Sequence, residues 1–184
     1  MIVETIFSTL DEEGRPNFAP MGLLFNGDFI LIRPYRKTQT CHNLLSSGHG
    51  VANLADDVLA YVQCGLYGII LPYFPAATIP GAVYDGTCSW MEMSVIEEKG
   101  TAERAEFRCQ VLHKGIQKEF TGFCRAHYAV IEAAILATRL DLTDRKIMAE
   151  KLMHYGEIVR KTGSDAEKQA FQLVHDYIGK RGKE

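Results

Sequence analysis

The sequence lacks several features by which secreted, membrane and zinc-binding proteins are usually identified. Its five cysteines are odd in number, are scattered along the chain and never form a CxxC pair, which argues against a disulfide framework and a structural zinc site. No apolar run approaches the ~20 residues that a membrane helix needs. The first residues lack the basic region and the apolar stretch of a signal peptide. We therefore expect a cytoplasmic protein with free thiols.

Charge and known catalytic motifs are also scarce. The formal net charge of −3 over 184 residues is too small to indicate nucleic acid or a membrane surface as a partner. The motifs GxGxxG, GxxxxGK[ST], HExxH and GxSxG are all missing, so Rossmann, P-loop, zincin and serine-hydrolase functions have no support. Cys124 and His127 have a helical spacing that permits metal ligation, but no further ligands are evident and core packing is the favoured interpretation. We expect no metal.

The first 115 residues have the pattern of β-structure. Residues 2–9 alternate in a stretch rich in β-branched side chains, which predicts a strand. A second predicted strand, 18–25, contains Pro20, and a proline within a strand implies an edge or a bulge. Asn26-Gly27 between apolar runs predicts a tight hairpin into a third strand, which begins at Asp28. The remaining predictions for this part are strands at 28–32, 51–54, 59–64, 87–98 and 101–112, a helix at 37–47 and an ordered covering loop at 65–86.

The pattern changes after about residue 115. From Ala126 onward, apolar residues recur at the spacing of a helix, which Thr121 could cap. Thr143 could cap a second helix, and Ser164-Asp165-Ala166-Glu167 is a capping box for a third. Strands followed by helices indicate an α+β protein with a mainly β core. We predict a barrel domain at 1–115 and a three-helix extension at 116–184.

Residues 14–54 carry the most informative pattern. In order they contain Gly14-Arg15-Pro16-Asn17-Phe18-Ala19-Pro20-Met21-Gly22, a hairpin to Ile32-Arg33, then Lys37-Thr38-Gln39-Thr40, Asn43-Leu44 and Val51-Ala52-Asn53-Leu54. This order resembles the FMN-binding split-barrel superfamily, which includes pyridoxamine-phosphate oxidases and flavin reductases. Trp90, Glu92, the 132–139 segment and the helical tail are similar to an archaeal-type FMN-binding family of unknown function within it. The resemblance implies a split β-barrel of six or seven strands.

The resemblance also implies a cofactor, a partner and a set of contacts. The cofactor is FMN, and the partner is a second copy of the chain, in a homodimer that holds FMN between its subunits. The apolar loop 65–86 would suit that interface. The implied flavin contacts are Met21, Gly22, Arg33, Thr38, Thr40, Asn43 and Asn53, with Lys37 and Gln39 as further candidates.

The chemistry of the 33–40 segment agrees with a phosphate site. A phosphate needs cations and donors that converge on one point. Arg33 offers a bidentate pair and Lys37 a point charge, while Thr38 and Thr40 offer donors at the start of a helix, where the dipole favours an anion. The alternative is a solvated basic turn after a strand, and on the spacing alone the two interpretations are equal.

The flavin ring needs an apolar floor and backbone groups at its pyrimidine edge. Met21 and Gly22 could supply these, since glycine allows close backbone approach; alternatively, Met21 is core and Gly22 a bulge. Asn53 could bond the ring edge. Asn43 could bond the ribityl chain or the phosphate, or act as a local helix cap. Trp90 could stack on a flavin or a substrate, although filling the core is slightly favoured.

The sequence thus predicts an FMN-dependent oxidoreductase that acts on an unidentified small molecule, with the flavin carrying the redox chemistry. It nominates no catalytic acid or base. The alternatives are a non-catalytic FMN protein that serves as an electron carrier or flavin store, and a split-barrel protein that uses a deazaflavin or haem.

Overall fold

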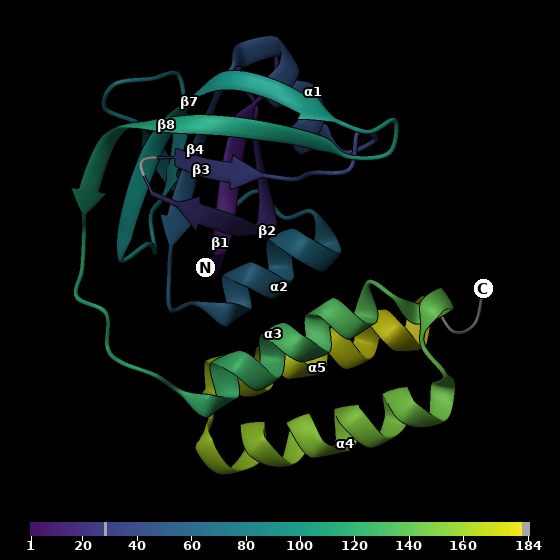
Figure 1. Cartoon of the computed structure of the whole chain (residues 1–184). Coiled ribbons are helices and arrows are strands. Elements are labelled where there is room, and N and C mark those ends of the chain that lie inside the picture. The colour runs from purple at the N-terminus through teal and green to yellow at the C-terminus, as the bar shows by residue number, and fades with distance from the viewer. Residues whose placement is uncertain (28, 182–184) are drawn as a thin grey trace. The chain divides into compact units, whose positions relative to one another are not determined.

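The computed structural model describes residues 1–27 and 29–181 (Figure 1). The predicted strand position of Asp28 lies outside the described residues. The contacts of the chain divide it into two compact units, one made of residues 1–55 and 70–120 and the other of 56–69 and 121–184. We describe each unit by itself. In the described chain, no helix has the length and apolarity that a bilayer crossing demands.

The first unit is a closed antiparallel barrel of six strands, which confirms the predicted split barrel. Around the barrel the strands follow the order β1-β2-β3-β8-β7-β4. Their bounds are β1 Ile2–Leu10, β2 Pro16–Asn26, β3 Phe29–Ile32, β4 His49–Leu54, β7 Ser89–Gly100 and β8 Ala105–Ile116. Helix α1, Gln39–Ser47, connects β3 to β4 and lies within the predicted range 37–47.

The interior of the barrel is filled by alternate side chains of its strands, as period-two patterning requires. Phe7, Leu23, Ile32, Met93 and Phe107 are each at most 1% exposed. The barrel is tight enough to need a glycine on β4, because a Cβ at position 50 would lie 2.3 Å from Cζ of the Phe7 ring.

The segment after β4 differs from its sequence-based prediction. The strand predicted at 59–64 is wrong, because Val58–Tyr67 forms helix α2. The side chain of Asp57 caps its first turn by accepting a hydrogen bond from the Ala60 N–H at 2.9 Å, and Gly68 ends it in the left-handed conformation. Local capping therefore outweighs the β-branched and aromatic content of this stretch. The predicted loop 65–86 also contains a two-stranded sheet of β5, Tyr73–Pro75, and β6, Ala82–Tyr84.

The second unit is helical. Besides α2 it contains α3 Arg125–Ala137, α4 Arg145–Thr162 and α5 Asp165–Arg181, with a 3-10 turn at Leu140–Leu142. The three predicted C-terminal helices are confirmed. Helix α3 packs against α2, α4 and α5 and buries a stripe of small side chains that includes Ala126, Ala129, Ala133 and Ala134.

The predicted caps of these helices are partly correct. The capping box at α5 is confirmed, since the Ser164 N–H donates to Glu167 Oε2 at 2.7 Å. Asp144 caps α4 in place of its neighbour Thr143. Thr121 does not cap α3, which begins after Cys124; its hydroxyl bonds Asp56 Oδ2 at 3.1 Å. The chain ends in a charged tail, Lys180-Arg181-Gly182-Lys183-Glu184, of which residues 182–184 lie outside the described residues.

Candidate functional site

The first turn of α1 carries the group of residues that the sequence assigned to phosphate binding. Thr38 is the N-cap, with extended backbone angles (φ −88°, ψ 150°). Its Oγ1 donates to the Tyr35 carbonyl at 2.7 Å and accepts from the Cys41 N–H at 3.4 Å. The first N–H groups of a helix have no intrahelical acceptor, and this turn contains no acidic residue. The turn therefore presents unopposed donors and a positive dipole end.

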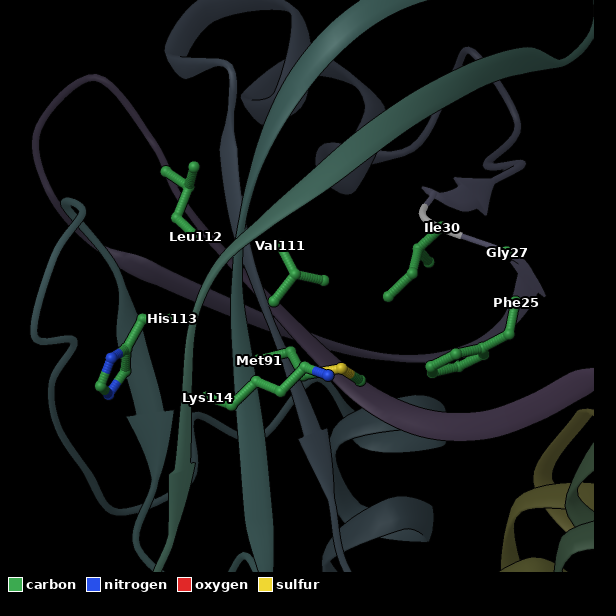
Figure 2. A pocket seen from close by; sticks show the side chains of 8 residues that line it. All are labelled: Phe25, Gly27, Ile30, Met91, Val111, Leu112, His113 and Lys114. Atoms are coloured by element: carbon green, nitrogen blue, oxygen red, sulfur yellow. The ribbon is translucent and has the colours of Figure 1, made fainter.

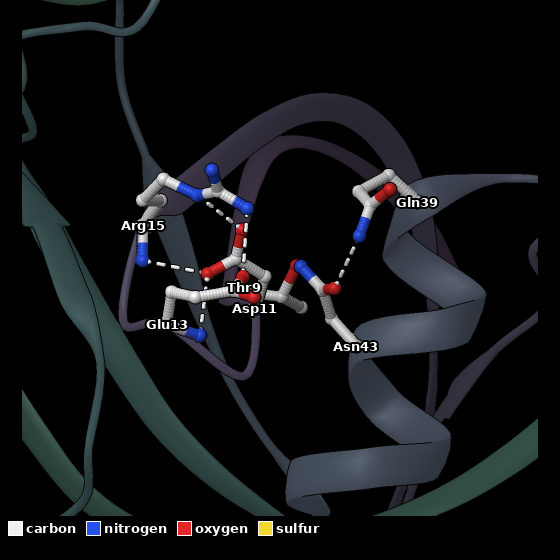
Figure 3. A network of polar contacts seen from close by, with 6 residues as sticks. All are labelled: Thr9, Asp11, Glu13, Arg15, Gln39 and Asn43. Atoms are coloured by element: carbon white, nitrogen blue, oxygen red, sulfur yellow. Dashed lines mark hydrogen bonds and ion pairs between the residues drawn. The ribbon is translucent and has the colours of Figure 1, made fainter.

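Hydrogen bonds tie this turn to the β1–β2 hairpin. Thr40 Oγ1 accepts from Asn17 Nδ2 at 3.1 Å, at the start of β2. Asn43 Nδ2 donates to Thr9 Oγ1 at 2.9 Å, and Asn43 Oδ1 accepts from Gln39 Nε2 at 2.7 Å (Figure 3). Thr40 and Asn43 are each 2% exposed. Their side chains therefore fix the position of the turn, while the exposed Gln39 is the outermost member of the network.

Sequence reasoning assigned no role to Asn17, which the structure joins to the site. The sequence offers one weak indication of a role for Asn17, because it is a polar residue directly after Pro16 at the start of a strand. In the hairpin itself, Asp11, Glu13 and Arg15 form a separate exposed cluster (Figure 3). The Arg15 guanidinium lies 2.7 Å from each carboxylate, so its charge is already balanced.

The cations beside the turn differ in how strongly they are paired. Arg33 Nε lies 2.6 Å from Glu106 Oε2, with the arginine side chain 52% exposed. Arg36 is held by Glu98 at 2.7 Å and by the Thr101 carbonyl at 2.6 Å. Lys37 is exposed and, among residues 1–27 and 29–181, its ammonium group makes no hydrogen bond or ion pair. Lys37 is thus the cation here that an incoming anion meets without displacing a carboxylate.

Strand β2 has an open edge next to this turn. Strand β3 pairs with β2 only from Leu24 to Asn26, so residues 17–23 have β1 on one side and no strand on the other among the described residues. Pro20 lies in this stretch, as expected of a strand proline. The edge leaves backbone groups free for a ligand.

Met21 and Gly22 lie on opposite faces of β2. Met21 packs against the barrel core, as the alternative interpretation proposed. Gly22 pairs with Glu4 in unbroken register and is not a bulge. A Cβ at position 22 would lie 3.0 Å from Ile2 Cγ2 and 3.1 Å from Glu4 Oε1, so glycine makes room for these two side chains of β1 on the outer face.

Asn53 lies apart from the other predicted site residues. It sits on β4 and is fully buried. Its Nδ2 donates to the Ile6 carbonyl at 2.9 Å, and its Oδ1 accepts from the Tyr84 N–H at 2.8 Å. The amide therefore joins β1, β4 and β6, and in this arrangement its groups do not face a ligand.

Glu92 is a buried carboxylate whose charge is satisfied by the protein. It accepts from the N–H groups of Ala77 and Thr78, each at 2.7 Å, from the Thr78 hydroxyl at 2.6 Å and from Trp90 Nε1 at 3.1 Å. Burial alone would raise the pKa of this carboxyl, but the hydrogen bonds, with the Thr78 hydroxyl first among them, outweigh burial and lower the pKa to about 2. Glu92 thus fastens the 77–78 segment to β7.

Trp90 shares this face of β7 with Glu92. Its indole meets the Phe74 ring edge-on, with centroids 5.6 Å apart, and a Cβ at Gly115 would collide with it. The structure therefore places Trp90 between β7 and the β5–β6 sheet as a packing residue.

Cys124 and His127 do not converge on a metal. The Cys124 thiol donates to the Thr162 carbonyl at 3.5 Å, whereas His127 Nε2 lies 3.1 Å from Glu167 Oε1. Across the described chain, no three His, Cys, Asp or Glu side chains are grouped as metal ligands.

A closed six-stranded antiparallel barrel with a short helix between β3 and β4 and an open β2 edge defines the FMN-binding split-barrel class of fold. Two family profiles match the chain, "Protein of unknown function (DUF447) N-terminal domain" over residues 3–118 and "Protein of unknown function (DUF447)" over residues 124–176. The protein belongs to the DUF447 family, which confirms the resemblance to a split-barrel family of unknown function.

Solved structures agree with this assignment. An FMN-bound protein of the same family from Methanosarcina mazei is 27% identical, with a TM-score of 0.84 over 96% of this chain and 94% of that one. A 2-nitrobenzoate 2-nitroreductase from Pseudomonas fluorescens is 17% identical, with a TM-score of 0.55 over 62% of this chain and 64% of its own. A flavoredoxin from Methanosarcina acetivorans is 11% identical, with a TM-score of 0.57 over 66% and 72%. The last two comparisons bear on the fold alone.

Proposed function

We propose that this protein binds FMN with the phosphate at the first turn of α1, and that it is an FMN-dependent oxidoreductase acting on a small molecule. The observation that carries the proposal is the fit of this turn to a phosphate, with unopposed N–H donors and the unpaired Lys37 beside them. The FMN-bound relative from Methanosarcina mazei supports the choice of anion.

The residues divide into those that touch the phosphate and those that hold them in place. Lys37, the Thr38 hydroxyl and the N–H groups of Gln39 and Thr40 would contact the phosphate. Arg33 would add a second cation, weakened by its pairing with Glu106 at 2.6 Å. The positioning residues are Thr40, through its side chain, together with Asn17 and Asn43.

The flavin ring would lie along the open edge and outer face of β2. Gly22 adds no side chain of its own to this face, so the ring would pack beside the Ile2 and Glu4 side chains that lie next to it. Met21 contributes its backbone because its side chain packs on the core. Asn53 acts indirectly in this proposal, by fixing β4 and β6. When bound, FMN supplies electron and hydride transfer, and the chain supplies binding and orientation.

We also propose that the protein forms a homodimer through the 65–86 segment, of which residues 70–86 belong to the barrel unit. Two large apolar side chains of this segment are exposed, Ile70 at 58% and Tyr73 at 47%. Exposed apolar side chains that gather in one segment are typical of an interaction surface.

The phosphate site is tested by the affinity for FMN. The absorption spectrum of the purified protein and mass analysis of any released cofactor identify what is bound. We expect Lys37→Ala to weaken FMN binding about tenfold, since the loss of one charge-assisted contact costs roughly 1.5 kcal/mol. Lys151→Ala, which removes an exposed lysine from α4, is the matched control and should not change the affinity.

The outcomes separate the parts of the proposal. Release of a deazaflavin or haem would show that the cofactor is different. Equal FMN affinity in wild type and Lys37→Ala would contradict the proposal that the phosphate binds at the first turn of α1. A true oxidoreductase should pass electrons from its reduced flavin to small enones, quinones or nitroarenes faster than free FMN does, whereas an electron carrier or flavin store should not.

A further inference from the structure

The barrel has a second candidate ligand site at the end opposite to α1. A pocket of about 420 Å³ opens there, where β2 ends and β3 begins. Its walls include Phe25, Ile30, Met91 and Val111, which belong to the inner face of the barrel or pack against it. The α1 turn lies at the other end, since it bonds residues at the end of β1 and the start of β2. The pocket is therefore separate from the proposed phosphate site.

A bulge in β8 places a cation in this pocket. Val111 pairs with Met93 and His113 pairs with Glu92, so that Leu112 is the extra residue. The bulge reverses the alternation of β8 and brings Lys114 opposite Met91, a core residue of the inner face. Paired residues lie on the same face of a sheet. Figure 2 shows Val111 and Lys114 projecting toward Met91, with Leu112 and His113 on the other side of the strand.

Lys114 is the lysine among the residues that line this pocket. Small barrels fill their interiors with apolar side chains, whereas Lys114 is exposed, so its ammonium group lies in water at the open end of the barrel. Among residues 1–27 and 29–181, Lys114 makes no hydrogen bond or ion pair. Bulges often re-aim a side chain beside a functional site, and here the bulge turns Lys114 to the inner face in place of His113, although both residues line the pocket.

We propose that this mouth binds a small carboxylate with an apolar body. The apolar part enters the barrel between Phe25, Ile30 and Met91, and the carboxylate meets the Lys114 ammonium at the opening. The pocket volume is in the range of small-molecule sites. The residues of this pocket differ from those proposed to hold FMN, and they lie at the end of the barrel opposite to the α1 turn.

The proposal is tested by calorimetric titration of the full-length protein, as purified, with octanoate and with 1-octanol, its uncharged counterpart. Lys114→Met keeps the aliphatic stem and removes the charge. We expect wild type to bind octanoate more tightly than octanol, and Lys114→Met to lose about tenfold in octanoate affinity with no change for octanol. Lys151→Met, which changes an exposed lysine on α4, is the matched control and should retain the affinity for octanoate.

Two results would overturn the proposal. One is octanoate that fails to bind at millimolar concentration, or that binds wild type and Lys114→Met equally. The other is a Lys114→Met protein that keeps its octanoate affinity but self-associates in sedimentation experiments. In that case the role of Lys114 would be to prevent strands of different copies from pairing. FMN affinity that stays unchanged in Lys114→Met confirms that the two sites are separate.

Discussion

At the scale of single residues, the molecule separates groups that meet a ligand from groups that hold the backbone. Lys37 is exposed, while Thr40 and Asn43 are buried and bonded to the β1–β2 hairpin. Glu92 belongs to the second kind, since its carboxylate is satisfied entirely from within the barrel unit. Substitutions of the first kind should alter binding, and substitutions of the second kind should alter stability.

Glu92→Gln should therefore destabilise the fold. The carboxyl has a pKa of about 2 in the folded protein against an ordinary value of 4.5, so its ionised form contributes about 3 kcal/mol to the free energy of unfolding at neutral pH. This contribution is present above pH 4.5 and is lost as the pH falls toward 2. Urea denaturation at pH 7 and pH 3 should show a difference between wild type and variant that shrinks at the lower pH.

Glu103→Gln is the control for this measurement, because Glu103 is exposed. Its unfolding free energy should follow that of wild type at both pH values. A Glu92→Gln protein as stable as wild type at pH 7 would contradict the role that we assign to the carboxylate.

At the scale of elements, capping residues determine where helices begin in segments whose intrinsic helix and strand propensities are similar. Helix α1 begins at a Thr38 cap and helix α2 at an Asp57 cap. In α2, residues such as Val58 and Val62 favour strands but are helical behind the Asp57 cap. Helix α2 packs against α3 and α5, so its formation also depends on partners far along the chain.

Asp57→Ala should weaken α2. The substitution removes the acceptor for the Ala60 N–H, which lies 2.9 Å from the carboxylate, and loss of such a cap costs about 1 kcal/mol. Thermal unfolding followed by circular dichroism should give a lower Tm for Asp57→Ala, while Asp57→Asn, which keeps a capping oxygen, should stay close to wild type. Equal Tm values for all three proteins would show that packing alone determines α2.

At the scale of the whole molecule, the chain builds a barrel unit and a helical unit, and residues 56–69 leave the first to join the second. The division into a barrel domain at 1–115 and a helical extension at 116–184 stays a prediction about independent folding. The proposed homodimer belongs to this scale as well, because it concerns the surface of the barrel unit and not its interior.

The double variant Ile70→Asp/Tyr73→Asp should dissociate the proposed dimer. Two carboxylates in an apolar interface lose hydration without gaining partners, so sedimentation equilibrium should give the mass of a monomer for this variant and of a dimer for wild type. Ile96→Asp, which changes an apolar residue on β7 that is 48% exposed, should remain a dimer. A monomeric wild type, or a dimeric double variant, would exclude this interface.

The sequence by itself determined the features that depend on local chemistry. Alternating β-branched residues and the Pro20 edge signal predicted the barrel strands, and the Ser164–Glu167 capping box predicted α5. The split barrel, by contrast, was implied by the family resemblance of residues 14–54, while the threonines of the 37–40 segment indicated the helix start that forms the α1 turn. These features are readable because neighbouring residues along the chain decide them.

Tertiary structure alone decided which predicted site residues meet. Register brought Asn17 to Thr40 and turned Asn53 into a buried link between strands. Packing between helices placed α2 against α3 and α5. The extra residue in β8 shifted the register of that strand and set Lys114 on the inner face of the barrel. Such outcomes depend on contacts between residues far apart in sequence, where a shift of a single position reverses the face on which a side chain lies.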